Sequence, residues 1–178
     1  LFHGPTLAFK DVALQLLGLL FEEFLGRSGK NLTIVGATSG DTGGAAVDAF
    51  AGLDNVDLIV LFPHGRISDV QRRMMTTAVD DNVHALAIEG TFDDCQALVK
   101  RAFADPALKH IPLSSANSIN IGRLLPQSVY YLYAASRLAK PGEPIVFCVP
   151  SGNFGDMMGA VIAGQMGLPI KKLVVPVN

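Results

Sequence analysis

Apolar and polar positions along this chain form short apolar runs that alternate with longer segments of helical periodicity. Each run is rich in Val, Ile and Leu without regular alternation, which is typical of strands that are covered on both faces. The expected strands are 32–37, 58–62, 84–88, a weak one near 112–115, 145–149 and 173–177. The expected helices between them are 11–26, 42–51, 68–79, 92–104, 121–138 and 156–167. Pro126 lies inside the fifth helix and leaves its start open, because proline interrupts the helical hydrogen bonds.

Start and stop signals support several of these helices. Ser68 with Gln71 and Thr91 with Asp94 have the spacing of an N-cap residue and its N3 partner. Gly26 stands where a left-handed helix end is expected. The repeated β-then-α order implies parallel strands joined by right-handed crossovers. The sequence therefore predicts an α/β fold of parallel sheets with helices on both faces, in which ligands bind beyond the carboxyl ends of the strands.

Three loops rich in Gly, Ser, Thr and Asn follow expected strands at those ends, at 37–44, 115–123 and 150–156. The last of them, P-S-G-N-F-G-D, links a strand to a helix. Its glycines let backbone N–H groups converge on one point, and the helix start adds partial positive charge, so a phosphate is the natural guest. The alternative is a tight turn in which Ser151 or Asn153 caps the helix.

The other two loops are also candidates for binding an anion. Residues 38–44, T-S-G-D-T-G-G, could hold a carboxylate or phosphate, or could form a glycine-rich turn. They have neither the Lys of a P-loop nor a G-x-S-x-G elbow, which argues against an α/β-hydrolase. In the loop 115–123, Arg123 could donate two bonds to a phosphate while Asn117 and Ser118 complete the cradle. The alternative there is an exposed Arg on the first turn of a helix.

Lys10 stands at the start of the first expected helix, in the segment H-G-P-T-L-A-F-K-D. A cation is disfavoured at a helix N-terminus, and this placement favours the neutral amine that Schiff-base chemistry requires. The alternative is a solvated Lys, and the adjacent Asp11 weakens the functional interpretation slightly.

Composition narrows the class of protein. With 178 residues, of which 49% are hydrophobic, the chain can bury a core as one domain or two small ones. The net charge of -2 gives no basic field for nucleic acid or an anionic membrane. No stretch approaches the roughly 20 apolar residues that span a bilayer, and no signal peptide is visible. Cys95 and Cys148 show no metal-ligand spacing, so we expect two reduced, buried thiols, no metal site and a cytoplasmic location. Because the chain begins at Leu1 and ends on an apolar run, we expect a piece of a longer protein.

Four segments together resemble the threonine synthases, within the fold-type-II family of pyridoxal-phosphate enzymes. They are H-G-P-T-L-A-F-K-D, A-T-S-G-D-T-G, S-A-N-S-I-N-I-G-R and P-S-G-N-F-G-D. The resemblance covers essentially the whole chain in the right order. Related dehydratases and cysteine synthases share the Lys and the glycine-rich loops, but their residues at each segment differ from these.

The resemblance implies a role for each motif residue. Lys10 would attach pyridoxal 5'-phosphate as a Schiff base and then act as the catalytic base. Asp41 would lie next to the ring hydroxyl of the cofactor, and Ser39 and Thr42 belong to the loop that takes the substrate carboxylate. The residues implied to wrap the cofactor phosphate are Gly152, Asn153, Phe154, Gly155 and Asp156. The residues implied to hold the phosphate of the substrate are Asn117, Ser118 and Arg123.

The resemblance also implies a domain division of the kind found in the tryptophan synthase β subunit. Residues 31–120 would form a small mobile domain, while residues 1–30 and 121–178 would belong to a larger one. The contact to the pyridine nitrogen would come from outside this chain, so the piece alone would be inactive. Nothing in the sequence fixes the oligomeric state.

The implied reaction converts O-phosphohomoserine and water into threonine and phosphate, in threonine biosynthesis. Two alternatives stay open at this point. One is a pyridoxal-phosphate dehydratase that acts on serine or threonine, and the other is a non-catalytic doubly wound module that binds nucleotides or phosphates.

Overall fold

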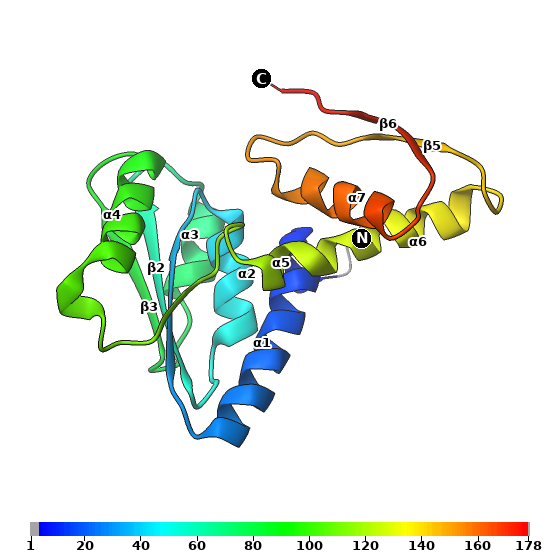
Figure 1. Ribbon diagram of the computed structural model, residues 1–178. Helices are drawn as coiled ribbons and strands as arrows, with labels where there is room; N and C mark the ends of the chain where they lie inside the picture. Colours follow the sequence, from blue (N-terminus) through cyan, green and yellow to red (C-terminus); the bar gives the residue numbers. More distant parts are fainter. Residues whose placement is uncertain (1–3, 178) are drawn as a thin grey trace. The chain divides into compact units, whose positions relative to one another are not determined.

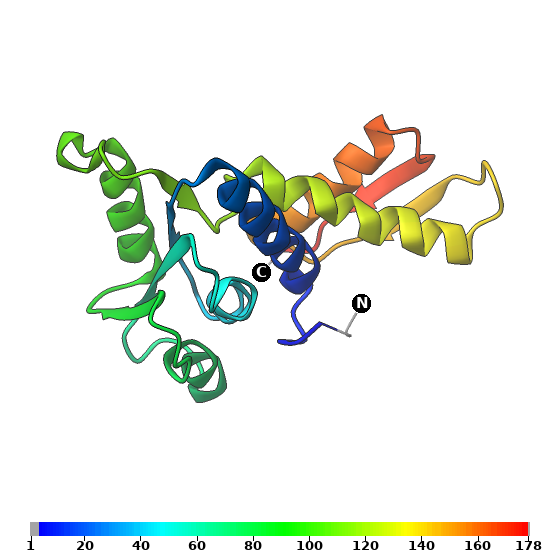
Figure 2. The same ribbon diagram turned by 90° about the horizontal axis from the view of Figure 1, so that it is seen from below.

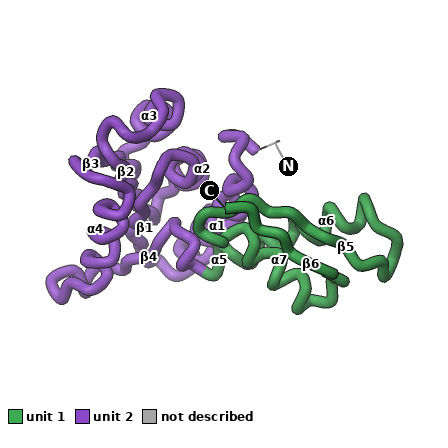
Figure 3. Tube along the Cα trace, turned by 90° about the horizontal axis from the view of Figure 1, so that it is seen from above, with its two compact units in different colours: residues 1, 121–178 green, residues 2–120 purple. Residues whose placement is uncertain are grey.

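The structure, a computed structural model, describes residues 4–177 (Figure 1). The described residues fall into two compact units (Figure 3), which we call the N-terminal unit, up to residue 120, and the C-terminal unit, from residue 121. Among residues 4–177, no helix combines the length and the apolar character that crossing a membrane requires.

The N-terminal unit is a four-stranded parallel sheet with helices on both faces. Its strands have the order β3-β2-β1-β4, and every neighbouring pair is parallel. The strands are β1 (Leu32–Ala37), β2 (Val56–Pro63), β3 (Val83–Ile88) and β4 (Leu113–Ser115). The helices are α1 (Lys10–Ser28), α2 (Asp41–Phe50), α3 (Asp69–Thr76), α4 (Phe92–Ala104) and the 3-10 turn η1 (Pro106–Leu108).

The two faces of this sheet carry separate cores. Figure 2 shows α4 on one face and α1 and α2 on the other. Alternation along the strands explains the division, since Ile34 packs with the residues of α1 and α2 while the next residue, Val35, packs with Cys95 and Val99 of α4. Burial on both faces is what the unbroken apolar strands predicted.

The C-terminal unit is built around two parallel strands. They are β5 (Ile145–Cys148) and β6 (Ile170–Val174), and they pair with each other. The helical segments are α5 (Ile121–Leu124), the 3-10 turn η2 (Leu125–Gln127), α6 (Ser128–Leu138) and α7 (Gly155–Gln165). Helix α7 approaches η2 closely at Gly159, where a Cβ atom would lie 2.7 Å from the backbone carbonyl carbon of Gln127. Only glycine permits that approach.

The structure confirms the α/β prediction and all twelve expected elements, with changes at their bounds. The expected helix 121–138 is interrupted by η2, which contains Pro126. The predicted end at Gly26 was wrong, because α1 continues to Ser28 and the left-handed residue is Gly29. The last strand begins at Ile170 rather than at residue 173.

Two capping predictions were confirmed and one about the cysteines was wrong. Ser68 with Gln71 and Thr91 with Asp94 each form a complete capping box. Cys95 is buried as expected, and burial raises the pKa of its thiol, but Cys148 on β5 is exposed. Burial alternates along β5, in a sheet of two strands, and Cys148 lies with Val146 on its exposed face in the described residues.

Helix α1 packs against α2 within the N-terminal unit. The assignment of residues 1–30 to a larger domain of the whole enzyme, with 121–178, stays a prediction. So does the mobility of 31–120. Residues 1–3, of which His3 begins the first motif, lie outside the described residues.

Candidate functional site

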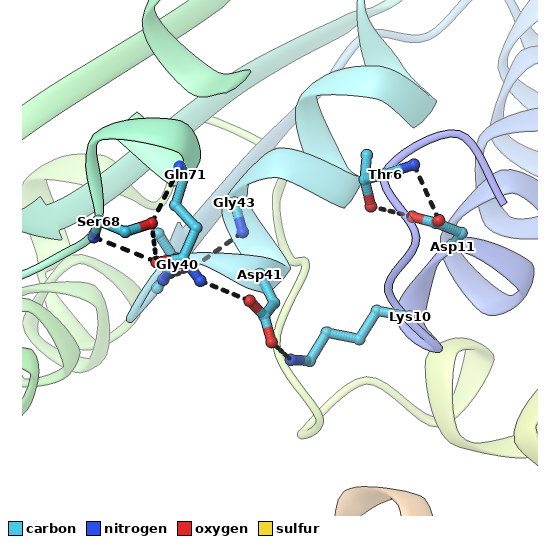
Figure 4. Close-up of polar contacts among 9 residues, drawn as sticks. Thr6, Lys10, Asp11, Gly40, Asp41, Gly43, Ser68 and Gln71 are labelled. Atoms are coloured by element: carbon cyan, nitrogen blue, oxygen red, sulfur yellow. Dashed lines mark hydrogen bonds and ion pairs between the residues drawn. The ribbon is translucent and has the colours of Figure 1, made fainter. Parts of the chain in front are cut away.

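Lys10 is the first residue of α1, as the sequence predicted. Its side chain is only 13% exposed, and its Nζ atom lies 3.3 Å from Oδ2 of Asp41, the first residue of α2 (Figure 4). The same ammonium lies 4.9 Å from the ring centroid of Phe9. A sheltered amine beside a carboxylate differs from the solvated Lys that was the alternative interpretation.

The neighbouring Asp11 has a separate task. It is 2% exposed, and its carboxylate accepts hydrogen bonds from the backbone N–H and the hydroxyl of Thr6. A Cβ atom at Gly4 would lie 2.2 Å from an oxygen of this carboxylate, so only glycine fits there. Asp11 therefore fixes the loop that precedes α1, and Figure 4 shows it directed at Thr6 while Lys10 is directed at Asp41. The sequence alone indicates Asp11 only as a neighbour of Lys10.

The loop between β1 and α2 is held by Thr38, a residue that sequence reasoning did not single out. Its buried hydroxyl oxygen accepts the backbone N–H groups of Gly40 and Gly43, each at 2.9 Å. Gly40 has φ of 137°, a conformation that side chains rarely allow. These bonds fix the backbone of the loop and leave Ser39 exposed and Thr42 half-buried at the start of α2.

Asp41 has a second partner that the sequence did not reveal. Its Oδ1 atom accepts a hydrogen bond of 2.6 Å from Nε2 of Gln71 on α3. The two oxygens of one carboxylate are thus bound by different elements, Oδ1 by α3 and Oδ2 by Lys10 of α1. The side chains of three helices, α1, α2 and α3, therefore meet at the Asp41 carboxylate.

Asn117 follows β4 and extends the pairing of that strand with β1. Its side-chain amide accepts from the N–H of Ala37 at 3.0 Å and donates to the carbonyl of Ala37 at 2.8 Å. The Asn117 amide is therefore engaged with the end of β1. The predicted contacts of Asn117 and Ser118 with a substrate phosphate stay predictions.

Arg123 lies in α5 and is only 3% exposed. The expected alternative, an exposed Arg on the first helical turn, is therefore wrong. Burial lowers the pKa of Arg123 to about 10, which means that the protonated guanidinium is held at a cost in free energy. A buried cation of this kind is suited to an anion as its ligand.

The loop 150–156 joins β5 to α7 in the C-terminal unit. A cavity of about 440 Å³ is lined by Ser151, Gly152 and Phe154 of this loop, with Pro150, Pro176 and Val177. No atom lies within 4 Å of the position that a Cβ would take at Gly152, so the backbone is open to the cavity there. Phe154 has the unusual φ of 59°, and Asn153 caps the turn by accepting the N–H of Gly155 at 3.2 Å.

Asp156, on the first turn of α7, forms a hydrogen bond with the hydroxyl of Tyr131 on α6. The Tyr131 hydroxyl lies 2.8 Å from Oδ1 of Asp156 and 3.1 Å from its carbonyl oxygen. Burial and this hydrogen bond raise the pKa of Tyr131 above its usual value, so it stays a donor. The Asp156 carboxylate is thus engaged by a buried phenol, and the part of Asp156 that can serve a phosphate is its backbone N–H.

The predicted site residues are therefore distributed over both units. Lys10, Asp41 and Thr42 lie at helix starts of the N-terminal unit, Ser39 just precedes α2, and the loop 152–156 leads into α7 of the C-terminal unit. The residues predicted for the substrate phosphate are divided, since Asn117 and Ser118 follow β4 in the N-terminal unit and Arg123 lies in α5 of the C-terminal unit. Among the residues that the structure describes, no group of three or more His, Cys, Asp or Glu side chains is suited to a metal ion.

Known proteins match this chain along its length. The model of the family described as "Pyridoxal-phosphate dependent enzyme" matches residues 1–176. The threonine synthase of Pseudomonas aeruginosa is 53% identical over 179 residues, which cover 100% of this chain and 38% of that protein.

Two solved structures are similar in both sequence and fold. A crystal structure of threonine synthase from Brucella melitensis with pyridoxal phosphate bound has 55% identity and a TM-score of 0.86, over 98% of this chain and 38% of that chain. The threonine synthase of Escherichia coli has 46% identity and a TM-score of 0.91, over 99% of this chain and 41% of that one. The chain thus spans about two fifths of the length of these relatives.

Proposed function

The chain belongs to the pyridoxal-phosphate dependent enzymes, and on that premise we propose that it forms the lysine-bearing part of a threonine synthase. The reaction would convert O-phosphohomoserine and water into threonine and phosphate. One observation carries the proposal: Lys10 is sheltered at a helix start, with its ammonium 3.3 Å from a carboxylate, in a chain 53% identical to a threonine synthase along its whole length. The relatives cover more sequence than this chain, so the activity is proposed for the full-length protein.

The loop 150–156 fits the phosphate of the cofactor. It has an open backbone at Gly152, lies at the N-terminus of an 11-residue helix and faces a cavity. Backbone N–H groups at such a helix start bind phosphate without a cationic side chain. We assign the phosphate contacts to residues 152–156, with the Asp156 carboxylate turned to Tyr131 and away from this task.

Pyridoxal phosphate, when bound, supplies a conjugated ring that takes up the charge left at the α-carbon of an amino-acid substrate. Lys10 would hold the cofactor through its Nζ atom, and the same atom would accept the α-proton of the substrate. Asp41 stabilises the ammonium that results. Ser39 and Thr42, at the start of α2, would bind the substrate carboxylate.

The choice of a phosphorylated substrate rests on Arg123. A fully buried guanidinium that is held charged against burial gains from a dianionic ligand. A dehydratase for serine or threonine has no substrate phosphate to place there. Asn117 and Ser118 would complete this site, although the side chain of Asn117 also binds Ala37.

We propose that residues 1–30 and 121–178 belong to a larger domain and 31–120 to a smaller mobile one. Both cysteines are free, in keeping with a reducing compartment such as the cytoplasm.

The test is covalent labelling of the full-length protein. Purified protein is loaded with pyridoxal phosphate and reduced with borohydride, and the modified lysine is located by mass spectrometry. The label is expected on Lys10, and Lys10→Ala should lose the cofactor absorbance, the label and turnover. Lys10→Arg is the matched control, because it keeps the charge beside Asp41 and cannot form the bond. A label on another lysine, or wild-type turnover in Lys10→Ala, would contradict the assignment, and absence of any cofactor absorbance would favour a binding module.

A further inference from the structure

Gln71 contacts the candidate site from a part of the chain that carries none of the four motifs. It lies on α3, 30 residues beyond Asp41, and its Nε2 atom donates to Oδ1 of Asp41 at 2.6 Å (Figure 4). The other oxygen of that carboxylate accepts from Lys10. Gln71 therefore reaches Lys10 through one intervening carboxylate.

The orientation of the Gln71 amide is fixed by its other end. Its Oε1 atom accepts the N–H of Ser68 at 3.3 Å and the hydroxyl of Ser68 at 3.0 Å, as the N3 residue of the capping box of α3. With the oxygen engaged by Ser68, the NH₂ group is turned toward Asp41. A flipped amide would place two acceptors against each other at 2.6 Å and leave the Ser68 donors without their acceptor.

The loop that carries Asp41 is shaped to receive this amide. A Cβ atom at Gly40 would lie 2.3 Å from Cδ of Gln71 and 2.4 Å from its Oε1. Gly40 also has the φ of 137° that side chains rarely allow, and its N–H is bound by the buried Thr38. The backbone before Asp41 and the amide of Gln71 thus pack directly on each other.

We propose that Gln71 is a positioning residue that holds the Asp41 carboxylate toward Lys10 and so sets the reactivity of that amine. The Asp41 side chain is 54% exposed, and without a second partner it would rotate into water. Only the catalytic meaning of this role rests on the proposed function, because the contact among the three side chains stands by itself.

The capping box supplies variants that separate this role from helix stability. Gln71→Glu keeps an acceptor for Ser68, and Glu is a favoured N3 residue, but it replaces the donor to Asp41 with a second negative charge. Ser68→Ala removes the hydroxyl that caps α3, at a cost of about 1 kcal/mol, but the backbone N–H of residue 68 still binds Oε1 of Gln71, so the donor to Asp41 stays in place. Gln71→Met removes the donor without adding charge.

The measurement is the rate at which Lys10 is reductively methylated by formaldehyde and cyanoborohydride, at neutral pH, in cofactor-free full-length protein. Peptide mass spectrometry resolves Lys10 from the other lysines, and only the neutral amine reacts. Gln71→Glu should slow the reaction roughly three- to tenfold, because a further carboxylate near the amine favours the ammonium form. Gln71→Met should accelerate it, since the ammonium loses a carboxylate that is held in place, and Ser68→Ala should leave it within twofold of wild type.

Equal rates in wild type and Gln71→Glu would overturn the proposal, as would a change of the same sign and size in Ser68→Ala. Gln71→Met keeps the test decisive if Gln71→Glu fails to fold. Failure of the proposed function looks different: Lys10 would then take no cofactor in the wild type, while the rate differences among these variants would persist.

Discussion

The buried guanidinium of Arg123 gives the sharpest test of a phosphate site. Burial lowers its pKa to about 10 and so disfavours the charged form by about 3 kcal/mol, at about 1.4 kcal/mol for each pKa unit. The sign follows from linkage: below pH 10 both folded and unfolded chains carry the proton, so the folded state bears the whole cost at neutral pH. Arg123→Met removes this cost together with the contacts that Arg123 makes in the folded state, so its urea unfolding without phosphate is the baseline from which its response to phosphate is measured.

Inorganic phosphate should stabilise wild type against urea but not Arg123→Met. The assay is urea unfolding of the full-length protein saturated with pyridoxal phosphate, so that the loop 150–156 is already filled. Inorganic phosphate at ten times its Kd should add about 1.4 kcal/mol to wild type and nothing to Arg123→Met. Arg123→Lys keeps the charge but loses the forked geometry, and it should respond partially. In turnover, Arg123→Met should raise KM for the phosphorylated substrate far more than it weakens cofactor binding.

Chloride at matched ionic strength is the control for general salt effects. Equal stabilisation of wild type and Arg123→Met by phosphate would refute the reasoning, and so would an unchanged KM. The first result would mean that phosphate acts by exclusion from the protein surface. The second would mean that Arg123 is a structural cation.

Two further predictions concern the framework of the site. Tyr131→Phe should keep the edge-on packing against Phe147, at 5.0 Å between ring centroids, but lose the bonds to Asp156, with a fall of about 1.5–3 kcal/mol in unfolding free energy and weaker cofactor binding in a fluorescence titration. Because burial and Asp156 raise the pKa of Tyr131 above 10.0, its contribution to stability is complete below that pH and declines above it, and the Phe variant should show a smaller decline in alkaline denaturation. Gly43→Ala should cost about 1–3 kcal/mol in urea unfolding, since its Cβ would lie 2.1 Å from Sδ of Met75 and 2.7 Å from Cγ2 of Thr38. Gly44→Ala is the matched control, because its nearest contact would be 3.4 Å, and equal stabilities of the two variants would contradict the packing argument.

The fold could be predicted from the sequence because each element carries its own local signal. The unbroken apolar strands and the capping boxes at Ser68 and Thr91 act over a few residues, and the structure confirmed both. The end of α1 was misplaced because Gly26 and Gly29 give the same local signal. Cys148 was misjudged because a strand pattern does not tell how many strands share its sheet.

Site prediction had a different limit. Lys10 and the glycine-rich loops could be found because each stands at the boundary of an element, where helix ends and open backbone have chemical consequences. Gln71 was visible only as half of a capping box, since its second bond joins residues 30 positions apart. Tyr131 gave no signal either, because an aromatic residue inside a helix is typical of a core. Such contacts depend on tertiary packing, which no local pattern encodes.

The two hydrogen bonds between the Asn117 side chain and the backbone of Ala37 bear on how the N-terminal unit folds. Strand β4 pairs with β1 over only three residues, and these bonds join positions 80 apart in the chain. Closing so long a loop is entropically costly and is recovered by few contacts, so we expect this edge to dock after β1, β2 and β3 have formed. The edge strand should then be the first to exchange its amide hydrogens, and replacing Asn117 should speed unfolding more than it slows folding.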